Sequence, residues 1–308
     1  MSSSVTLESA GSENGITLII HAGAGNRSRH ATPESRKQTQ ADLQRALDAG
    51  YALLESGANA QDAVIAAIHI MEDAPEFNAG RGAALTSDGI AQMDACLMTG
   101  DGEVGAVAGL STVRNPIDAA LAVKDKTKHV LFAEPTADEI ADWGLTTEPN
   151  EYFITERRRR SHAEAQRDGD DWEKHGTIGA VARDITGAIA AGTSTGGITN
   201  QMHGRVGDSP LPGCGTFADR RTVAVSCTGI GEAFIKAVAA HQVSDRVRFA
   251  GETVHDAAVA TLDEVAAHHG DGGMIVLPAT GRGLVAYNSE TMNFGYRSED
   301  GGRVHAAD

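Results

Sequence analysis

Apolar residues fall into short runs and helical repeats along the first half of the chain. Residues 16–21 form a β-branched apolar run that predicts a buried strand, and the glycine-rich residues 22–25 predict a tight loop after it. In residues 38–56 and 60–72, Ala, Leu and Ile recur at three- and four-residue spacing, which predicts two helices packed as a pair. Turn signals then flank a short strand predicted over residues 91–98.

Groups of strands and groups of helices follow one another in the rest of the chain. A helix from about Pro116 through Ala122 and a strand over residues 130–133 close the first half. Later strands are predicted over residues 178–182, 188–193, 222–227, 274–278 and 283–287, and later helices over residues 232–241 and 253–268. This segregation favours an α+β fold, with layered sheets flanked by helices, over a doubly wound sheet.

Between these halves lies the most polar stretch of the chain, residues 136–175. Its end, residues 167–175, is dominated by charges and has almost nothing to bury, which predicts an exposed, mobile linker. The basic run from Arg157 to Arg160 lies among Glu, His and Asp. A solvated helix or linker is the favoured interpretation of this run, and a binding patch is the less favoured one.

The composition is that of a folded, acidic protein. Apolar residues make up 41% of the 308 residues and charged residues 22%, which is too apolar for a disordered chain. The net charge of −16 repels nucleic acid phosphates and anionic membranes, so we expect neither as a partner. Three cysteines without a C-x-x-C pair suggest neither a disulfide framework nor a zinc cluster, and residues 1–15 lack the apolar run of a signal peptide. We therefore expect a cytoplasmic protein.

One motif, at residues 192–196, matches the G-x-S-x-G nucleophile elbow of serine hydrolases. That motif requires a strand that turns directly into a helix. Residues 197–215 instead contain five glycines and two prolines and show no helical periodicity. Ser194 is therefore not predicted to be a nucleophile.

Thr177 is a stronger candidate because of its surroundings. A Gly-Thr pair at a strand start is by itself usually structural. Here Gly176 precedes the hydroxyl residue, a polar stretch lies upstream and a buried strand begins downstream, which suits cutting of the chain. A threonine hydroxyl needs a base, and a free α-amino group with a pKa of about 8 is a better base at neutral pH than lysine at about 10.4. Self-cleavage before Thr177 would release such an amine, and Gly176 would allow a strained approach of the hydroxyl to the preceding carbonyl.

Seven short blocks carry a resemblance to one family. They are IHAGAG (residues 20–25), FNAG (77–80), MDA (93–95), GTIGAV (176–181), TSTGG (193–197), GRVGDSP (204–210) and CTG (227–229). Through these blocks the whole chain resembles the plant-type asparaginase and isoaspartyl-peptidase family of N-terminal nucleophile hydrolases. The resemblance implies a four-layer αββα sandwich, built from an α subunit of residues 1–176, with a polar linker at 155–176, and a β subunit of residues 177–308. It also implies one folded domain in total and a homodimer of αβ units.

The resemblance assigns the reacting groups. Thr177 is the implied nucleophile, released by cleavage between Gly176 and Thr177. Thr195 would lie beside it and orient the hydroxyl or the amine, although Thr195 could equally fill a strand. Thr228 and Gly229 resemble an oxyanion hole, in which a hydroxyl and a backbone N–H stabilise the tetrahedral intermediate.

The resemblance also assigns residues that bind the substrate. Arg205 would bind the α-carboxylate with its planar, permanently charged fork, and Asp208 would accept the α-ammonium group. Gly231 would permit close backbone contact with substrate, and Asn78 would brace the nucleophile during processing or binding. From the residues alone, Arg205 and Asp208 are more often a loop ion pair, and a turn-forming role competes for Asn78.

No cofactor for catalysis is implied. The segment around residues 71–81 resembles a loop whose main-chain carbonyls hold a structural sodium ion, an oxygen-rich site suited to a hard cation. The implied donors are the backbone carbonyls of Met71, Glu72, Ala74, Phe77, Ala79 and Arg81.

Three activities compete within the family: hydrolysis of L-asparagine and β-aspartyl dipeptides, hydrolysis of glycosylated asparagine, and taspase-like threonine proteolysis. Gly196 and Gly197 after Thr195 resemble the asparaginase branch, so we expect the first activity and a small-molecule or dipeptide substrate with an aspartyl unit. From another class, a non-enzymatic binding protein that kept the fold is the alternative, which the intact Arg205 and Asp208 disfavour.

Overall fold

Two β-sheets organise the protein. The computed structural model describes residues 4–25, 32–168 and 176–307. The larger sheet has eight strands, in spatial order β13 (Gly301–His305), β12 (Thr291–Ser298), β2 (Thr17–Gly25), β6 (Ile178–Arg183), β7 (Ile189–Thr195), β3 (Met93–Thr99), β4 (Val104–Leu110) and β5 (Leu131–Ala133). The smaller sheet has five, in the order β1 (Thr6–Ala10), β11 (Gly283–Tyr287), β10 (Gly272–Pro278), β9 (Val223–Gly229) and β8 (Thr216–Ala218).

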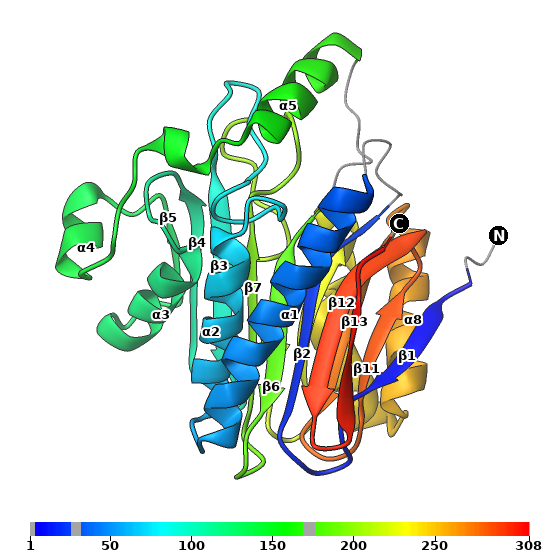
Figure 1. Ribbon diagram of the computed structural model, residues 1–308. Coiled ribbons are helices and arrows are strands. Elements are labelled where there is room, and N and C mark those ends of the chain that lie inside the picture. The colour runs from blue at the N-terminus through cyan, green and yellow to red at the C-terminus, as the bar shows by residue number, and fades with distance from the viewer. Residues whose placement is uncertain (1–3, 26–31, 169–175, 308) are drawn as a thin grey trace.

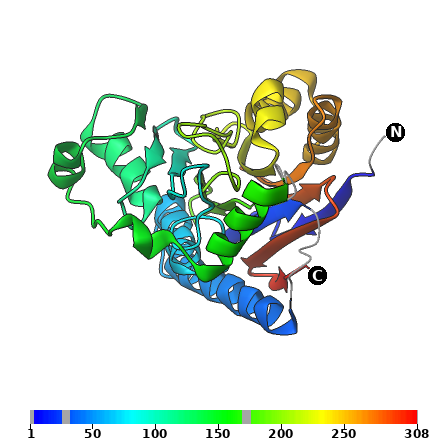
Figure 2. The same ribbon diagram turned by 90° about the horizontal axis from the view of Figure 1, so that it is seen from above.

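Helices cover the outer face of each sheet (Figure 1). The eight-stranded sheet carries α1 (Pro33–Glu55), α2 (Ala60–Asp73) and α3 (Pro116–Lys126). The five-stranded sheet carries α6 (Gly231–Ala237), α7 (Ala239–Asp245) and α8 (Val254–Ala267). Figure 2 shows these two groups of helices on opposite sides, with the strands between them. Within the described ranges, no helix is both long enough and apolar enough to cross a membrane.

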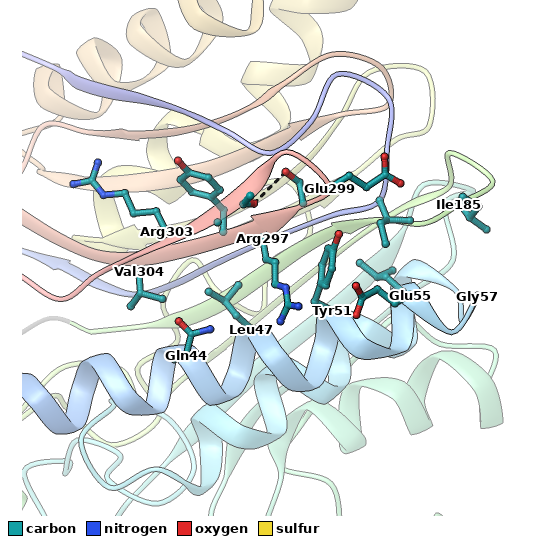
Figure 3. Close-up of a pocket in the computed structure, with 16 residues that line it drawn as sticks. Gln44, Leu47, Tyr51, Glu55, Gly57, Ile185, Arg297, Glu299, Arg303 and Val304 are labelled. Atoms are coloured by element: carbon teal, nitrogen blue, oxygen red, sulfur yellow. Dashed lines mark hydrogen bonds between the residues drawn. The ribbon is translucent and has the colours of Figure 1, made fainter.

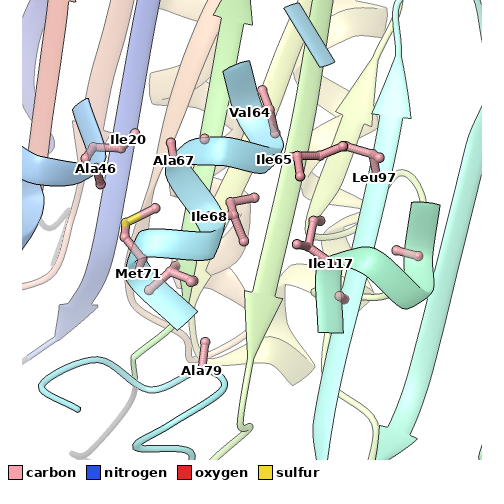
Figure 4. Close-up of a cluster of buried hydrophobic side chains, with 14 of the residues drawn as sticks. Ile20, Ala46, Val64, Ile65, Ala67, Ile68, Met71, Ala79, Leu97 and Ile117 are labelled. Atoms are coloured by element: carbon pink, nitrogen blue, oxygen red, sulfur yellow. The ribbon is translucent and has the colours of Figure 1, made fainter. Parts of the chain in front are cut away.

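Buried hydrophobic side chains fill three layers. One lies between the eight-stranded sheet and α1 to α3, one between the two sheets, and one between the five-stranded sheet and α6 to α8. Because side chains alternate along a strand, Ile178 and Ala180 of β6 face the first layer, whereas Val181 faces the second. Figure 4 shows Val64 and Ile68 of α2 in the first layer. Burial of a Val or Ile side chain contributes about 1.5–3 kcal/mol. The two helix-covered sheets confirm the α+β class predicted from the sequence.

Most predicted elements are present, with two changes. The sequence predicts a loop over residues 22–25, but β2 continues through Gly25 because pairing with β12 keeps these small residues in the sheet. The single helix predicted over residues 232–241 is divided into α6 and α7 at Val238, which has a left-handed φ of 49°. This break lets the N–H groups of Ala240 and His241 donate to the carbonyls of Cys214 and Gly213, at 3.0 and 2.8 Å.

The polar stretch is folded up to residue 168, so the first part of the linker implied over residues 155–176 is a helix. It contains α4 (Ala137–Asp142), a 3-10 helix (Asn150–Phe153) and α5 (Glu156–Asp168). Phe153 is fully buried and Arg158 is only 8% exposed, so the basic run is helical but is not solvated throughout. The polar composition of this segment does not predict its folding, because only a few buried side chains, such as Phe153 and Arg158, attach it to the core. Residues 169–175, the charged end of the predicted linker, lie outside the described residues.

A carboxyl group beneath the larger sheet joins three elements. Glu72 is fully buried near the end of α2, and its Oε1 accepts the N–H of Ile117 at the start of α3, at 3.0 Å. Ser194 of β7 lies beside it. Burial raises the pKa of Glu72 to about 7, although the neighbouring Ser194 and His69 act in the opposite direction. An ionised Glu72 is therefore costly in this core.

We expect Glu72→Gln to stabilise the protein at alkaline pH. The pKa of this carboxyl rises from 4.5 to about 7 on folding, so its destabilising effect is absent below the unfolded-state value, grows as the pH rises between the two values and is complete above pH 7. Glutamine keeps an oxygen for the N–H of Ile117. Urea unfolding should show a gain of about 3 kcal/mol at pH 8 that disappears below the unfolded-state pKa of the carboxyl. A gain that is the same at both pH values would contradict this account.

Candidate active site

Two threonines face each other where strands β6 and β7 meet at one end of the larger sheet. The antiparallel register pairs Ile178 with Ser194, which places the preceding Thr177 opposite Thr195. The Thr177 hydroxyl donates to Thr195 Oγ1 at 3.2 Å, and Thr195 Oγ1 also accepts the N–H of Gly197 at 3.0 Å. Both threonines are buried. Their side chains point into the space between the two sheets. Along each strand they lie an even number of residues from Val181 of β6 and Ala191 of β7, which face that space.

The carbonyl of Gly176, at the predicted cleavage site, is held by side chains from two directions. Asn78 Nδ2 donates to it at 2.6 Å, and the Thr195 hydroxyl donates to it at 3.3 Å. Asn78 Nδ2 also donates to the carbonyl of Gly197 at 2.6 Å, while Asn78 Oδ1 accepts the N–H of Ala84 at 2.7 Å. Asn78 is therefore more than a turn former, since all its polar atoms converge on this site.

The reason for glycine at position 176 differs from the one predicted. Gly176 does not have a positive φ, so its backbone is not in the left-handed conformation that glycine alone tolerates well. A Cβ at this position would instead lie 3.0 Å from the Cβ of Asn78. Glycine thus allows Asn78 to approach the peptide bond closely.

The predicted oxyanion residues come from the other sheet. Thr228 and Gly229 end strand β9, and the Thr228 oxygen accepts the N–H of Ala24 in β2 at 3.3 Å, which leaves its hydroxyl hydrogen to donate elsewhere. Gly229 has φ 148°, and a Cβ there would lie 2.3 Å from the carbonyl oxygen of Asp271. Only glycine fits this turn, which places the backbone at the pocket wall.

Arg205 pairs with a residue that the sequence analysis did not predict. Its Nε and Nη2 donate to both carboxylate oxygens of Glu232, at 3.0 and 2.9 Å. The loop ion pair considered between Arg205 and Asp208 is therefore not the arrangement seen. Both side chains nevertheless converge on Gly231, where a Cβ would lie 2.9 Å from Asp208 Oδ1 and 3.0 Å from Arg205 Nη2. Gly231 is needed for this close packing.

Acidic groups dominate the electrostatics around Arg205. Asp208 is buried, and its Oδ2 has no hydrogen-bond partner in the part of the chain that the structure describes. Burial raises the pKa of Asp208 to about 7 against the opposing effect of Arg205, while Glu232 and Asp94 raise it further. Burial likewise raises the pKa of Asp94 to about 6. A ligand that brings a positive charge to Asp208 Oδ2 would satisfy this unpaired oxygen.

These groups share one narrow pocket. The predicted residues that line it are Gly176, Thr177, Thr195, Arg205, Asp208, Gly229 and Gly231. Asn78 and Thr228 do not line the pocket, but Asn78 contacts Gly176 and Thr228 directly precedes Gly229. A larger groove lies elsewhere, between α1 and the β12–β13 hairpin, near Tyr51 and Arg297 (Figure 3). That groove contains none of the predicted site residues, so chemistry rather than size identifies the candidate site.

Backbone carbonyls of the predicted sodium loop lie close to Gly80 and Gly82. The carbonyls of Met71, Glu72 and Ala74 each accept one backbone N–H, at 3.3, 2.7 and 3.3 Å, and each keeps a second lone pair. A Cβ on Gly80 would lie 2.4 Å from the Glu72 oxygen, and one on Gly82 would lie 2.6 Å from the Phe77 oxygen. Glycine at positions 80 and 82 thus allows the backbone to pack closely against these carbonyls.

Several residues near the site were missed by the sequence analysis. Glu232 directly follows Gly231, and Asp94 lies in the MDA block, but neither shows its partner in the sequence. His21, in the first block, is fully buried and contacts Ser226 Oγ at 2.8 Å, and burial lowers its pKa to about 3. Residues 192–196 do not form a nucleophile elbow, as predicted from the sequence. No helix follows β7 up to residue 215, and Ser194 faces Glu72.

A buried hydroxyl beside a polarised peptide bond, next to a charged pocket, is an arrangement suited to a hydrolase. The chain belongs to the asparaginase family, because the sequence model of that family matches residues 14–305. It is 39% identical to the isoaspartyl peptidase of Salmonella typhimurium, over 91% of this chain and 94% of that protein. It is 38% identical to the isoaspartyl peptidase of Escherichia coli, over 89% and 90% of the two chains. It is also 36% identical to human isoaspartyl peptidase/L-asparaginase, over 95% of each. The family resemblance and the hydrolase class are thus confirmed.

Proposed function

We propose that the protein cuts itself before Thr177 and then hydrolyses the side-chain amide of L-asparagine and of β-aspartyl dipeptides. One observation carries the proposal. The Gly176 carbonyl oxygen accepts hydrogen bonds from Asn78 Nδ2 and from the Thr195 hydroxyl, which is itself hydrogen-bonded to the Thr177 hydroxyl. Hydrogen bonds that converge on a peptide carbonyl favour the negative charge that develops on its oxygen during attack. The names of the three relatives support the same substrates.

Self-cleavage follows from this geometry. The Thr177 oxygen attacks the Gly176 carbonyl carbon, and Asn78 and Thr195 stabilise the oxygen that becomes negative. The bond from that carbon to the Thr177 nitrogen then breaks, and the nitrogen takes the proton that the hydroxyl lost. Water hydrolyses the resulting ester, which gives a Gly176 carboxylate and a Thr177 with free hydroxyl and amine.

Turnover uses the same hydroxyl with its new base. The neutral α-amine of Thr177 takes the hydroxyl proton, and the oxygen attacks the substrate side-chain carbonyl. The Thr228 hydroxyl and the Gly229 N–H stabilise the negative oxygen of the intermediate. Ammonia or an amine leaves with the transferred proton, and water then releases L-aspartate from the Thr177 ester.

Substrate recognition uses the charges at the other end of the pocket. The substrate α-carboxylate takes the place of the Glu232 carboxylate on Arg205, since both are planar two-oxygen acceptors. The α-ammonium group binds the unpaired Asp208 Oδ2. Gly231 keeps the space between these two groups open.

The sheet and helix arrangement is consistent with the αββα sandwich of N-terminal nucleophile hydrolases. In this proposal residues 1–176 form the α subunit and residues 177–308 the β subunit of one folded domain, and two αβ units form a homodimer. In this proposal the backbone carbonyls of Met71, Glu72, Ala74, Phe77, Ala79 and Arg81 would hold a structural sodium ion that stiffens the loop carrying Asn78. No catalytic step requires that ion.

Thr177→Ala should give an uncut, inactive chain, because cleavage and turnover draw on one hydroxyl. The wild-type protein should separate under denaturing conditions into fragments 1–176 and 177–308, identified by intact mass. Thr177→Ser is the matched control, which keeps a hydroxyl and should still cleave, although more slowly. A wild-type chain that is fully active without cleavage would refute the proposal. Assays on L-asparagine, a β-aspartyl dipeptide and glycosylated asparagine, run in parallel, decide among the family activities.

Arg205→Ala should weaken substrate capture while self-cleavage continues. Loss of a bidentate charged pair costs about 1.5–3 kcal/mol, so KM for a β-aspartyl dipeptide should rise about 10- to 100-fold. Arg220→Ala is the control, since Arg220 lies 72% exposed in a surface ion pair with Asp101. Unchanged kinetics in Arg205→Ala would disprove its contact with the α-carboxylate.

The pH dependence should reveal Asp208. Its pKa is raised to about 7, so the ionised form that binds an ammonium group disappears as the pH falls below this value. We expect kcat/KM for L-asparagine to fall over that range more steeply than kcat/KM for succinamic acid, which lacks the α-ammonium group. The Thr177 amine affects both compounds alike, so parallel profiles would argue against the role of Asp208.

A further inference from the structure

Helix α5 precedes the proposed cleavage site in the chain, and its side chains contact the loop that carries Asn78. Arg158 of α5 is 8% exposed, and its Nε donates to the carbonyl oxygen of Gly82. The neighbouring Arg157 donates to the Glu76 carbonyl at 2.5 Å. The N–H of Gly82 in turn donates to the carbonyl of Phe153 at 2.8 Å. Both polar groups of the Gly82 backbone are thus fixed by the segment 150–168.

A short chain of contacts leads from Gly82 to the scissile peptide bond. Two residues beyond Gly82, the N–H of Ala84 donates to Asn78 Oδ1 at 2.7 Å. The hydrogen bond from Ala84 fixes the orientation of the Asn78 side-chain amide, because it requires the amide oxygen on that side. The amide nitrogen then faces the carbonyls of Gly176 and Gly197. A shift of Gly82 would move Ala84 and release the amide from that orientation.

The location of Arg158 is not explained by stability alone. A guanidinium group stays charged in proteins, and taking it out of water is costly unless its environment compensates. Burial lowers the pKa of Arg158 well below its usual range, and the charge of Arg157 lowers it further. Arg160, two residues along the same helix, remains exposed. A surface position was thus open to a basic residue on this helix, yet Arg158 is directed at one backbone carbonyl.

We propose that Arg158 is a positioning residue for self-cleavage, which holds the loop of residues 75–84 so that the Asn78 amide stays on the Gly176 carbonyl. This inference rests on the proposed cleavage before Thr177. Residues on the N-terminal side of the cleaved bond would then take part in its cleavage. Docking of α5 onto the loop then has to precede cleavage, so the chain is cut only after residues 150–168 have folded.

The experiment follows cleavage of the full-length chain in time. Precursor made by cell-free synthesis is sampled at intervals, and the fraction converted to fragments 1–176 and 177–308 is measured by intact mass. Arg158→Met should slow cleavage about tenfold or more, because a misplacement on the scale of 1 Å is enough to disturb such a site. Arg160→Met, the same change on the exposed face of α5, should cleave at the wild-type rate.

A double-mutant cycle with Asn78 separates positioning from general destabilisation. Asn78→Ala should slow cleavage by itself. If Arg158 acts through Asn78, adding Arg158→Met to Asn78→Ala should slow cleavage little further, whereas a merely structural loss would multiply the two effects. Multiplied effects would overturn the proposal, as would a wild-type rate in Arg158→Met.

A second variant covers the case in which Arg158→Met does not fold. Arg158→Lys keeps the charge but lacks a donor at the Nε position, so it should fold and still cleave several-fold more slowly than wild type. Cleavage of Arg158→Lys at the wild-type rate would overturn the proposal. If the wild-type chain itself does not cleave, the proposed function fails instead, and the two failures are distinguished.

Discussion

The hydrogen bonds on the Gly176 carbonyl oxygen are the constraint on which the rest of the site depends. One donor, Asn78, stands in a loop after α2, and the other, Thr195, ends a central strand of the larger sheet. Because the two donors come from segments more than 100 residues apart, they meet only when the sheet, α2 and the loop are all in place. The geometry proposed for self-cleavage is therefore a property of the completed core rather than of the local sequence around Gly176 and Thr177.

The sequence predicts elements well where the apolar pattern is strong. Helices α1 and α2 and strands β6 and β7 have buried faces that repeat along the chain, and they were found at or near their observed positions. Strands β1, β12 and β13 were not predicted, because they lie toward the edges of their sheets and are mixed in polarity. For the segment of α5 the sequence favours a solvated helix or linker without deciding between them, since its burial depends on contacts with the distant loop after α2 rather than on an apolar face of its own.

The candidate site divides in the same way. Thr177 could be singled out because its significance lies in neighbours along the chain, namely glycine, a polar stretch and a buried strand. The resemblance then supplied Thr195, Arg205 and Asp208, and the structure brings these residues to one pocket. Glu232 and Arg158 were not found, because their partners lie 27 and 76 residues away and nothing local marks the pairing.

Exposure decides which charges around Arg205 can be exchanged. The Glu232 side chain is 42% exposed, whereas that of Arg205 is 15% exposed. Glu232 can therefore move into water and leave the guanidinium to another carboxylate at small cost, since an exposed ion pair contributes little. The Asp208 side chain is buried and stays in the pocket wall, so in the proposed function it fixes where the substrate ammonium group lies.

The strand order of the larger sheet has a consequence for a chain divided after residue 176. Strand β2 from the earlier piece lies between β12 and β6 from the later piece, and β6 and β7 separate β2 from β3. Strands of the two pieces therefore alternate within one sheet, and ladders of backbone hydrogen bonds join them wherever they are neighbours. Neither piece can leave without dismantling the common sheet, so the nicked molecule should melt as a single cooperative unit.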